Sequence, residues 1–303
     1  MLKMESYLGW KVDFRSPRGA PSLLAPDSMH WRVFKNPIAL GVGGVAAVLL
    51  EFADPRIRSG VWEHSTYKSD PIGRSMRTGM AAMVGVYGSE AAAQRIAQAV
   101  TNMHARVAGE TPGGAPYRAL DPDLLDWVAA TATFGFLHAY DRFASRLTGD
   151  EKRRFYAEAA SGAQLYGART SPRSDEDFMA MLHALLPGFE PHPIVGEFLD
   201  IFASSPGPLG APKSLRRAMA RAAVSILPPV VRSRLQLGRA YDLHPAAAAL
   251  LRGMGAIAER TPIKSAPPAQ ACVRIGLPAD FLYRGRAAQT RALGAWRARG
   301  GAH

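Results

Sequence analysis

The stretch DPDLLDWVAATATFGFLHAYDRFASRL, residues 121–147, decides the fold of this chain. Asp121-Pro122 is typical of a helix start, because proline fits the first turn of a helix. From Asp123 to Leu147 apolar side chains cover much of the helical circumference, as in a helix buried at the centre of a protein. The sequence therefore predicts a long central helix against which other helices pack.

Helical patterns flank this segment on both sides. Three glycines at 41, 43 and 44 are expected to let another backbone or a flat ligand approach closely. Thr148-Gly149-Asp150-Glu151 matches a capping box. Further helices are expected over residues 38–52, 55–62, 71–87, 90–107, 148–166, 177–186, 214–227, 245–260 and 286–299. No alternating strand pattern of useful length appears, so the predicted fold class is all-α, a single globular helical bundle around a cofactor pocket.

Charge and proline content divide the 303 residues unevenly. Residues 201–303 carry 16 Lys and Arg against 3 Asp and Glu, whereas residues 1–200 carry 21 against 22. A break rich in proline and glycine runs from Pro206 to Pro212. We expect an N-terminal arm (1–28), a helical core that binds the cofactor (29–205) and a basic helical C-terminal region packed on that core (206–303).

Compartment and partners follow from a few simple features. Cys272 is the single cysteine, which excludes an internal disulfide and a cysteine-cluster metal site. The first 18 residues are polar, and the apolar run 38–50 is shorter than the roughly 20 residues that span a bilayer. These features predict a cytoplasmic protein. We expect the basic region either to bind anionic membrane surfaces through Arg216–Arg234 or to form a solvated surface with no such partner. Its few aromatic residues argue against nucleic acid.

One histidine stands out as a candidate ligand. His104 lies at the edge of an apolar helical stripe formed by Ile96, Val100, Met103 and Val107. A neutral imidazole in such surroundings can be an axial ligand of an iron porphyrin, although a lone histidine is more often a hydrogen-bonded structural residue. Arg74, Arg77 and Thr78 share one face of the preceding helix, and arginine suits haem propionates.

Other candidate site residues are less distinctive. His64 fits a polar pocket residue, and His138, on the long apolar helix, fits a hydrogen-bonded core residue. Glu51 and Glu63 are possible bases that nothing in their neighbourhood singles out. The sequence contains no HExxH motif, no paired-carboxylate metal motif and no G-x-S-x-G motif, which argues against a zinc or di-iron site and a serine hydrolase.

An ordered series of short motifs resembles the DUF2236 family, also described as MpaB-like oxygenases and as the catalytic domain of rubber oxygenase (latex-clearing protein). The series covers roughly residues 30–285. Its members are Ala53-Asp54-Pro55, His64-Ser65, Asp70-Pro71-x-x-Arg74-x-x-Arg77-Thr78, Tyr87-Gly88, Met103-His104-Ala105-Arg106-Val107-Ala108-Gly109, Tyr117-x-Ala119-x-Asp121-Pro122, Trp127-Val128-x-Ala130-Thr131, Tyr156-x-Glu158 and Leu227-Pro228-Pro229-x-Val231-Arg232.

The resemblance implies an all-α fold around haem b. It implies that His104 is the iron ligand and that Arg74, Thr78 and Thr131 contact the cofactor. Arg77 stands where latex-clearing enzymes have a lysine, and an arginine stays protonated and cannot ligate iron as an amine does. With Thr78 and His64, Arg77 is expected to act on bound dioxygen. Ala129 replaces a histidine found in many relatives.

The sequence leaves open two functions from different classes. The first is a haem b-dependent oxygenase that binds dioxygen at His-ligated iron and oxidises an apolar small molecule, with unsaturated compounds as candidates. Rubber oxygenases are secreted with a twin-arginine signal that is not seen here, so we expect a substrate other than rubber. The alternative is a non-catalytic haem- or lipid-binding helical protein that associates peripherally with anionic membranes. The departures at Arg77 and Ala129 also leave open a soluble helical protein that has lost its cofactor.

Overall fold

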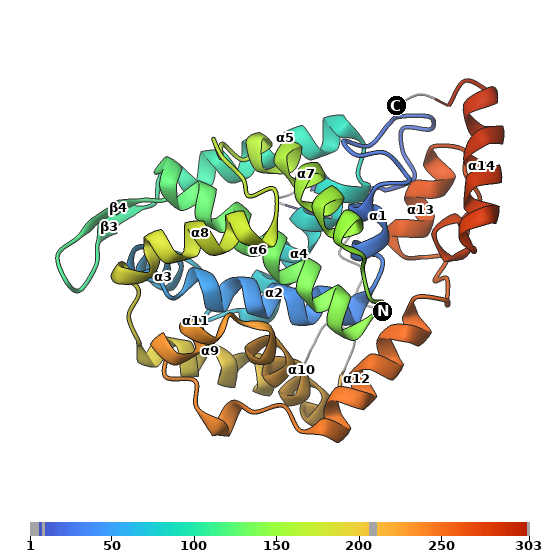
Figure 1. The fold of residues 1–303 in the computed structure, drawn as a ribbon. Coiled ribbons are helices and arrows are strands. Elements are labelled where there is room, and N and C mark those ends of the chain that lie inside the picture. The colour runs from blue at the N-terminus through green and yellow to red at the C-terminus, as the bar shows by residue number, and fades with distance from the viewer. Residues whose placement is uncertain (1–5, 8–9, 206–210, 302–303) are drawn as a thin grey trace.

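Helices make up most of the structure, a computed structural model that describes residues 6–7, 10–205 and 211–301 (Figure 1). The fold class is all-α, as predicted. The α-helices are α1 (Met29–Phe34), α2 (Pro37–Glu51), α3 (Pro55–His64), α4 (Pro71–Tyr87), α5 (Glu90–His104), α6 (Pro122–Phe143), α7 (Gly149–Leu165), α8 (Asp175–Leu185), α9 (Pro193–Ser204), α10 (Lys213–Ile226), α11 (Pro229–Arg234), α12 (Pro245–Ala258), α13 (Pro267–Arg274) and α14 (Arg286–Ala298). Three short 3-10 helices are η1 (Leu186–Gly188), η2 (Arg239–Tyr241) and η3 (Phe281–Tyr283), and two antiparallel hairpins pair β1 (Ser6–Tyr7) with β2 (Trp10–Lys11) and β3 (Ala108–Glu110) with β4 (Pro116–Arg118).

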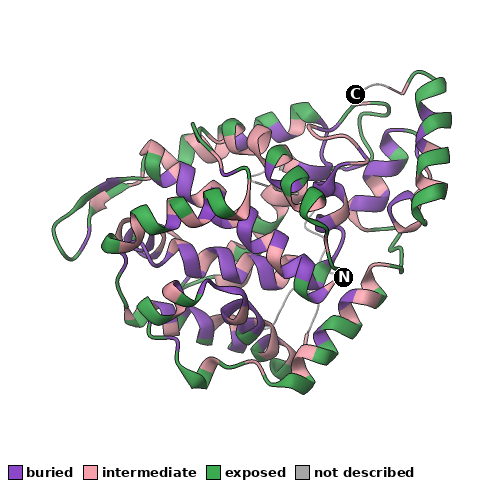
Figure 2. Ribbon diagram, in the orientation of Figure 1, coloured by how far each residue is buried: buried purple, intermediate pink, exposed green. Residues whose placement is uncertain are grey.

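Helices α2 and α6 form the centre of the molecule, as their purple, buried residues show in Figure 2. Glycine lets their backbones touch: a Cβ on Gly43 would lie 2.8 Å from the carbonyl oxygen of Gly135, and one on Gly135 would lie 2.5 Å from that of Gly43. The Met219 side chain of α10 occupies the space beside Gly41. Of the two expected neighbours, another backbone or a flat ligand, the structure shows a backbone at Gly43, and a methionine fills the space beside Gly41.

Side-chain caps explain where several helices begin. Asn36 accepts hydrogen bonds from the backbone N–H groups of Ile38 and Ala39 at the start of α2, and Ser89 accepts one from Ala92 at the start of α5. The predicted capping box is confirmed, with Thr148 and Glu151 bonded reciprocally at the start of α7. These caps satisfy N–H groups that a helix cannot satisfy within its own first turn.

The segment after His104 differs from the prediction. Helix α5 ends at His104 rather than at 107, and residues 108–110 pair with 116–118 as a hairpin. Tyr117 is buried against this hairpin's own backbone, because a Cβ on Gly109 would lie 2.7 Å from the Tyr117 hydroxyl. Gly109 therefore sits in a strand instead of ending a helix. The long central helix also ends early, at Phe143 rather than at 147.

The basic C-terminal third packs on the rest of the chain. Helix α10 lies against α2 and α9, and α12 lies against α2 and α6. Arg274 of α13 is fully buried and donates to the carbonyl oxygens of Phe14 (3.1 Å), Ala20 (3.0 Å) and Tyr87 (2.6 Å), so it joins the N-terminal arm to α4. Most of the predicted break at 206–212 lies outside the described residues.

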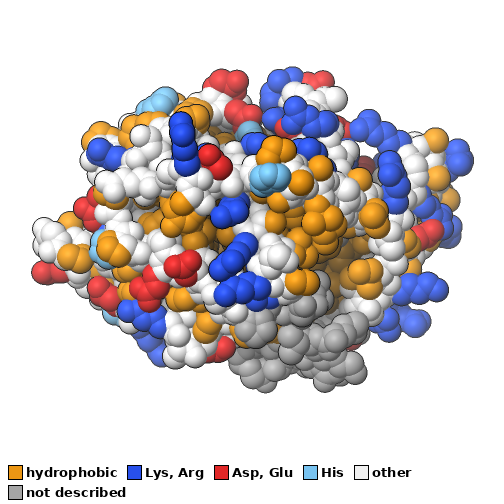
Figure 3. All heavy atoms as spheres, turned by 90° about the horizontal axis from the view of Figure 1, so that it is seen from below, with side chains coloured by type: hydrophobic (Ala, Val, Ile, Leu, Met, Phe, Trp, Pro, Cys, Tyr) orange, Lys and Arg blue, Asp and Glu red, His pale blue; other side chains and the backbone are white. Residues whose placement is uncertain are grey.

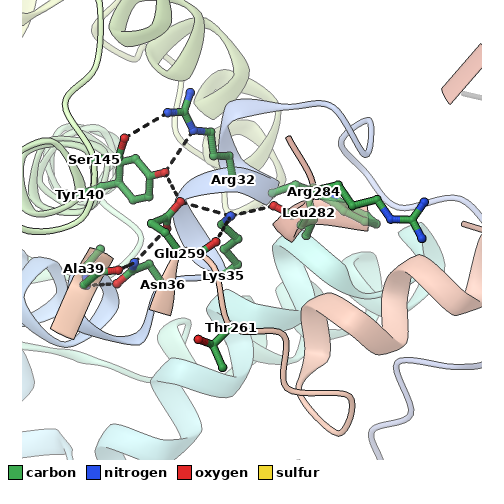
Figure 4. Close-up of polar contacts among 12 residues, drawn as sticks. Arg32, Lys35, Asn36, Ala39, Tyr140, Ser145, Glu259, Thr261, Leu282 and Arg284 are labelled. Atoms are coloured by element: carbon green, nitrogen blue, oxygen red, sulfur yellow. Dashed lines mark hydrogen bonds and ion pairs between the residues drawn. The ribbon is translucent and has the colours of Figure 1, made fainter. Parts of the chain in front are cut away.

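A buried network of polar side chains holds the end of α12 to the core (Figure 4). Lys35 Nζ lies 3.2 Å from Glu259 Oε2, and it also donates to the carbonyl oxygen of Leu282 at 2.7 Å. Asn36 Nδ2 donates to Glu259 Oε1 at 2.9 Å, and the Tyr140 hydroxyl donates to Glu259 Oε2 at 2.7 Å. Burial lowers the pKa of Lys35, and the negative charge of Glu259 opposes that shift. We call these four residues (Lys35, Asn36, Tyr140 and Glu259) the Glu259 network.

The length and composition of the helices bear on whether the chain could cross a membrane. Among the described residues, no single helix combines the length and the apolar composition needed to cross a bilayer. Helices α2 and α3 reach that length only together, and they meet at an angle of 113°.

Candidate functional site

The positive charge of Arg74 influences ionisable side chains from three other parts of the chain. Asp70 caps α4 by accepting a hydrogen bond from Gly73 N at 2.8 Å, and this fixes the first turn, which carries Arg74. The positive charge of Arg74 acts on Glu51 at the end of α2, on Tyr67 just before α4 and on His104 at the end of α5. Thr131 contacts Glu51. We call Arg74, Glu51, Tyr67, His104 and Thr131 the Arg74 cluster.

Glu51 is the group in this cluster whose pKa is moved into the neutral range. Burial raises its pKa to about 7, even though Arg74 and a hydrogen bond from Thr131 favour the charged form. Thr131 Oγ1 lies 3.3 Å from Glu51 Oε1 and 2.9 Å from the carbonyl oxygen of Val128. A carboxyl group with such a pKa can hold or release a proton near neutral pH, as a general acid or base must.

His104 has the properties of a neutral ligand. It is half-buried, and its pKa is lowered by burial and by the positive charge of Arg74. A neutral imidazole has a ring nitrogen free to coordinate a metal. Within the described ranges, no three His, Cys, Asp or Glu side chains are grouped to hold a metal ion. A neutral histidine can be an axial ligand of haem, and an arginine can pair with a haem propionate.

The apolar stripe predicted beside His104 is only partly buried. Ile96 is buried, Val100 and Val107 are half-buried, and Met103 is 41% exposed. The stripe therefore runs from the core toward the surface, and His104 lies at its outer end.

Arg77 and Thr78 lie on α4 near Arg74, but their hydrogen bonds go to the segment before α4 and to a backbone carbonyl group. Arg77 donates to Thr66 Oγ1 at 2.6 Å and to Asp70 Oδ2 at 3.3 Å, both in the segment that precedes the helix. Thr78 is exposed, and its hydroxyl donates to the carbonyl oxygen of Arg74 at 3.1 Å. The structure thus does not bring these two side chains together with the Arg74 cluster, and their catalytic roles stay predictions.

His64 belongs to a second polar group, at the end of α3. Its Nε2 lies 3.2 Å from the hydroxyl of Tyr117, which donates to Glu63 Oε2 at 3.0 Å. Because the single hydroxyl hydrogen goes to Glu63, the His64 ring donates from Nε2. Burial and the charge of Glu63 raise the pKa of Tyr117 to about 12. His64 is exposed, and its predicted role in catalysis is also untested by this arrangement.

Two residues of these groups were missed in the sequence. Tyr67 is buried, and its pKa is raised by that burial. It lies in a short connection with no periodic pattern, so nothing in the sequence marks it. Tyr117 stands in the motif Tyr-x-Ala-x-Asp-Pro, which offered a signal. By contrast, His138 is hydrogen-bonded as predicted, with Nε2 2.8 Å from Asp175 Oδ1.

The basic helix expected at the surface is less exposed than predicted. Arg216 is buried and donates to the carbonyl oxygens of Ala203 and Ser204, both at 3.3 Å. It thereby satisfies carbonyl groups at the C-terminal end of α9. Arg234 donates to the carbonyl oxygen of Phe189 at 2.7 Å. Arg216 is therefore turned toward the protein, whereas Arg234 stays exposed while it holds this carbonyl group.

The fold and the Arg74 cluster describe an all-α protein with a neutral histidine beside an arginine and a protonatable carboxyl group. Over residues 31–260 the chain matches the family described as ER-bound oxygenase mpaB/B'/Rubber oxygenase, catalytic domain. The chain belongs to this family of oxygenase catalytic domains, which confirms the resemblance inferred from its motifs. All residues of the Arg74 cluster lie within the matched range. No curated protein and no solved structure matches the chain.

Proposed function

We propose that this protein is a haem b-dependent oxygenase that acts on an apolar small molecule, with unsaturated compounds as the first candidates. Membership of an oxygenase family supports the reaction class. The observation that carries the proposal is the position of His104, half-buried and kept neutral beside Arg74. That position matches what an axial ligand and a neighbouring propionate require.

Three residues would hold the cofactor. His104 would ligate the iron, Arg74 would pair with a propionate and Thr131 would contribute its hydroxyl. When bound, haem supplies the binding of dioxygen and the redox chemistry, while the protein orients the substrate and limits the access of water. Because the backbones of α2 and α6 touch at Gly43 and Gly135, the cofactor would lie outside that interface, beside His104 and Arg74.

The protein's own contribution to proton movement centres on Glu51. Its carboxyl group is protonated in a large fraction of molecules at neutral pH, because its pKa is about 7. Thr131 donates to the same carboxyl group and so holds it in one orientation. Glu51 is therefore placed to give a proton to, or take one from, a group bound beside Arg74.

The predicted dioxygen-facing residues would have to change partners to act. Arg77 must leave Asp70 and Thr66 before its guanidinium can face a bound molecule. Exposed ion pairs of this kind contribute about 0–1 kcal/mol, so such a change is energetically accessible.

A visible absorption spectrum tests the proposal directly. The protein is produced with a supply of haem, purified and compared with His104→Ala and with His183→Ala. His183 is an exposed histidine of α8, which makes it a matched control. We expect a Soret band with about one haem per chain in the wild type and in His183→Ala, and loss or a shift of that band in His104→Ala.

Two results would contradict the proposal. One is wild-type protein that stays colourless although it is folded by circular dichroism. The other is a Soret band that His104→Ala leaves unchanged. Oxygen uptake with a panel of unsaturated apolar compounds then separates an oxygenase from a protein that only binds haem.

A further inference from the structure

A basic pocket lies on the side of the molecule formed by the C-terminal third. It has a volume of about 660 Å³ and opens between the end of α6, helix α10 and the segment from α11 to the start of α12. Its ionisable lining residues are Arg142, Arg221, Arg232, Arg239, Asp242 and His244. On the face seen in Figure 3, Lys and Arg side chains gather beside patches of hydrophobic ones.

The positive charges in this pocket are only partly balanced. Asp242, its single acidic residue, pairs with Arg232. Arg142 donates to the carbonyl oxygen of Ser225 at 2.7 Å, a contact that leaves its charge uncompensated. The pKa of Arg142 is lowered by burial and by the positive charges of Arg252 and Arg146, so further cations lie nearby.

Two arginines in the pocket are available to a ligand. Arg221 and Arg239 are exposed, and neither side chain has a hydrogen-bond or ion-pair partner among the residues that the structure describes. His244 Nδ1 accepts the backbone N–H of Ala246 at 3.2 Å, which leaves Nε2 as a hydrogen-bond donor. The pocket therefore offers several donors and an excess of positive charge.

We propose that this pocket binds a phosphate group. Guanidinium groups pair with phosphate through two parallel hydrogen bonds, and two or more of them can share its oxygens. A doubly charged anion would also balance the excess positive charge better than a carboxylate. This site lies apart from the Arg74 cluster and does not depend on haem.

The phosphate could come from a membrane lipid or from a soluble molecule. Helix α12 begins at the pocket and exposes Leu250 (57%) and Ile257 (66%), which are two turns apart on one face. Exposed apolar side chains next to a phosphate site are what a lipid headgroup in a bilayer would meet. A free phosphate compound needs only the pocket, so the two sources can be separated by experiment.

The experiment compares wild type with Arg221→Gln/Arg239→Gln and with a charge-matched control, Arg291→Gln/Arg299→Gln. The control residues are exposed and belong to α14 and its C-terminal end. Binding of inorganic pyrophosphate is measured by calorimetry, and binding to phosphatidylcholine vesicles with and without phosphatidic acid is measured by sedimentation. Circular dichroism verifies that all three proteins are folded.

We expect the pocket variant to bind at least about tenfold more weakly than wild type, since each charge-assisted hydrogen bond contributes about 1.5–3 kcal/mol. The control should stay within about twofold of wild type. Pyrophosphate binding without vesicle binding would indicate a soluble phosphate compound. Binding to phosphatidic acid vesicles that pyrophosphate displaces would indicate a lipid headgroup. Absence of binding to both probes, or an equal loss in both variants, would overturn the proposal.

Discussion

Helices α2 and α6 take part in two polar groups that differ in how their charges are paired. Asn36 and Tyr140 belong to the Glu259 network, whereas Glu51 and Thr131 belong to the Arg74 cluster. In the Glu259 network the buried lysine has a nearby carboxylate and several hydrogen-bond acceptors (Figure 4). In the Arg74 cluster, burial shifts the pKa of Glu51 and of His104 toward their neutral forms.

This difference separates a structural group from a candidate functional one. Buried ionisable groups that are paired and hydrogen-bonded fix the position of the chain segments that carry them. Groups held in an altered protonation state, close to one positive charge, are typical of sites that bind or react. The same pair of helices therefore anchors the C-terminal region through the Glu259 network and carries two candidate functional side chains of the Arg74 cluster.

Removal of Glu259 should have the largest effect on stability. Glu259→Ala leaves the buried ammonium of Lys35 without its carboxylate, and breaking such a pair costs about 4 kcal/mol. Urea unfolding should show this loss. The exposed Glu197 of α9 forms no ion pair with the described residues, and its substitution by Ala should change stability by less than about 0.5 kcal/mol. A small loss for Glu259→Ala would mean that the network is not structural.

A methyl group at the crossing of α2 and α6 should have the next largest effect. In Gly135→Ala the new Cβ would lie 2.5 Å from the carbonyl oxygen of Gly43 and 3.2 Å from Ala47 N, and backbone atoms cannot easily move away. We expect destabilisation of about 3 kcal/mol by thermal or urea unfolding. Gly162→Ala in α7, where a Cβ meets nothing within 4 Å, should instead stabilise by about 0.5–1 kcal/mol.

Glu51→Gln should have a smaller effect that depends on pH. The folded-state pKa is raised from 4.5 to about 7, so the folded protein keeps a proton that the unfolded chain releases above pH 4.5. This contribution to stability is complete below pH 4.5 and is lost as the pH rises through about 7. Glutamine resembles the protonated form, so the variant should match wild type near pH 4 and be more stable by about 3 kcal/mol near pH 8.

Unfolding of both proteins over this pH range provides the measurement. Equal pH dependence in Glu51→Gln and in wild type would show that the Glu51 carboxyl group is not buried as described. The same titration on Glu197→Ala should keep the wild-type pH dependence, because this exposed residue belongs to neither polar group.

Local sequence signals predicted many helix starts and few of the tertiary contacts. The caps at Asn36, Ser89 and Thr148 could be predicted from the local sequence, because each satisfies N–H groups of its own helix. The hairpin after His104 was not, because strands of three residues are too short to show an alternating pattern. Burial of Arg216 was also missed, since its acceptors lie at the end of a different helix.

The candidate site also combines residues that local patterns predicted with residues whose properties depend on tertiary packing. His104 and Arg74 were predicted from the face of the helix on which each lies, and the packing of α4 on α5 places them in one electrostatic environment. Glu51 was named among possible bases without a reason to prefer it. Its altered pKa arises from burial at the junction of α2, α4 and α6, which no local pattern encodes.

The contact between the backbones at Gly43 and Gly135 also constrains how the protein could take up a broad planar molecule. Two helices whose backbones touch without intervening side chains are expected to move as one rigid unit, since separating them would open a void along the middle of the molecule. Expansion is cheaper where side chains are small and half-buried, as along much of α4 and α5. If the proposed haem binds, we therefore expect α4 and α5, and not α2 and α6, to move apart when it enters or leaves.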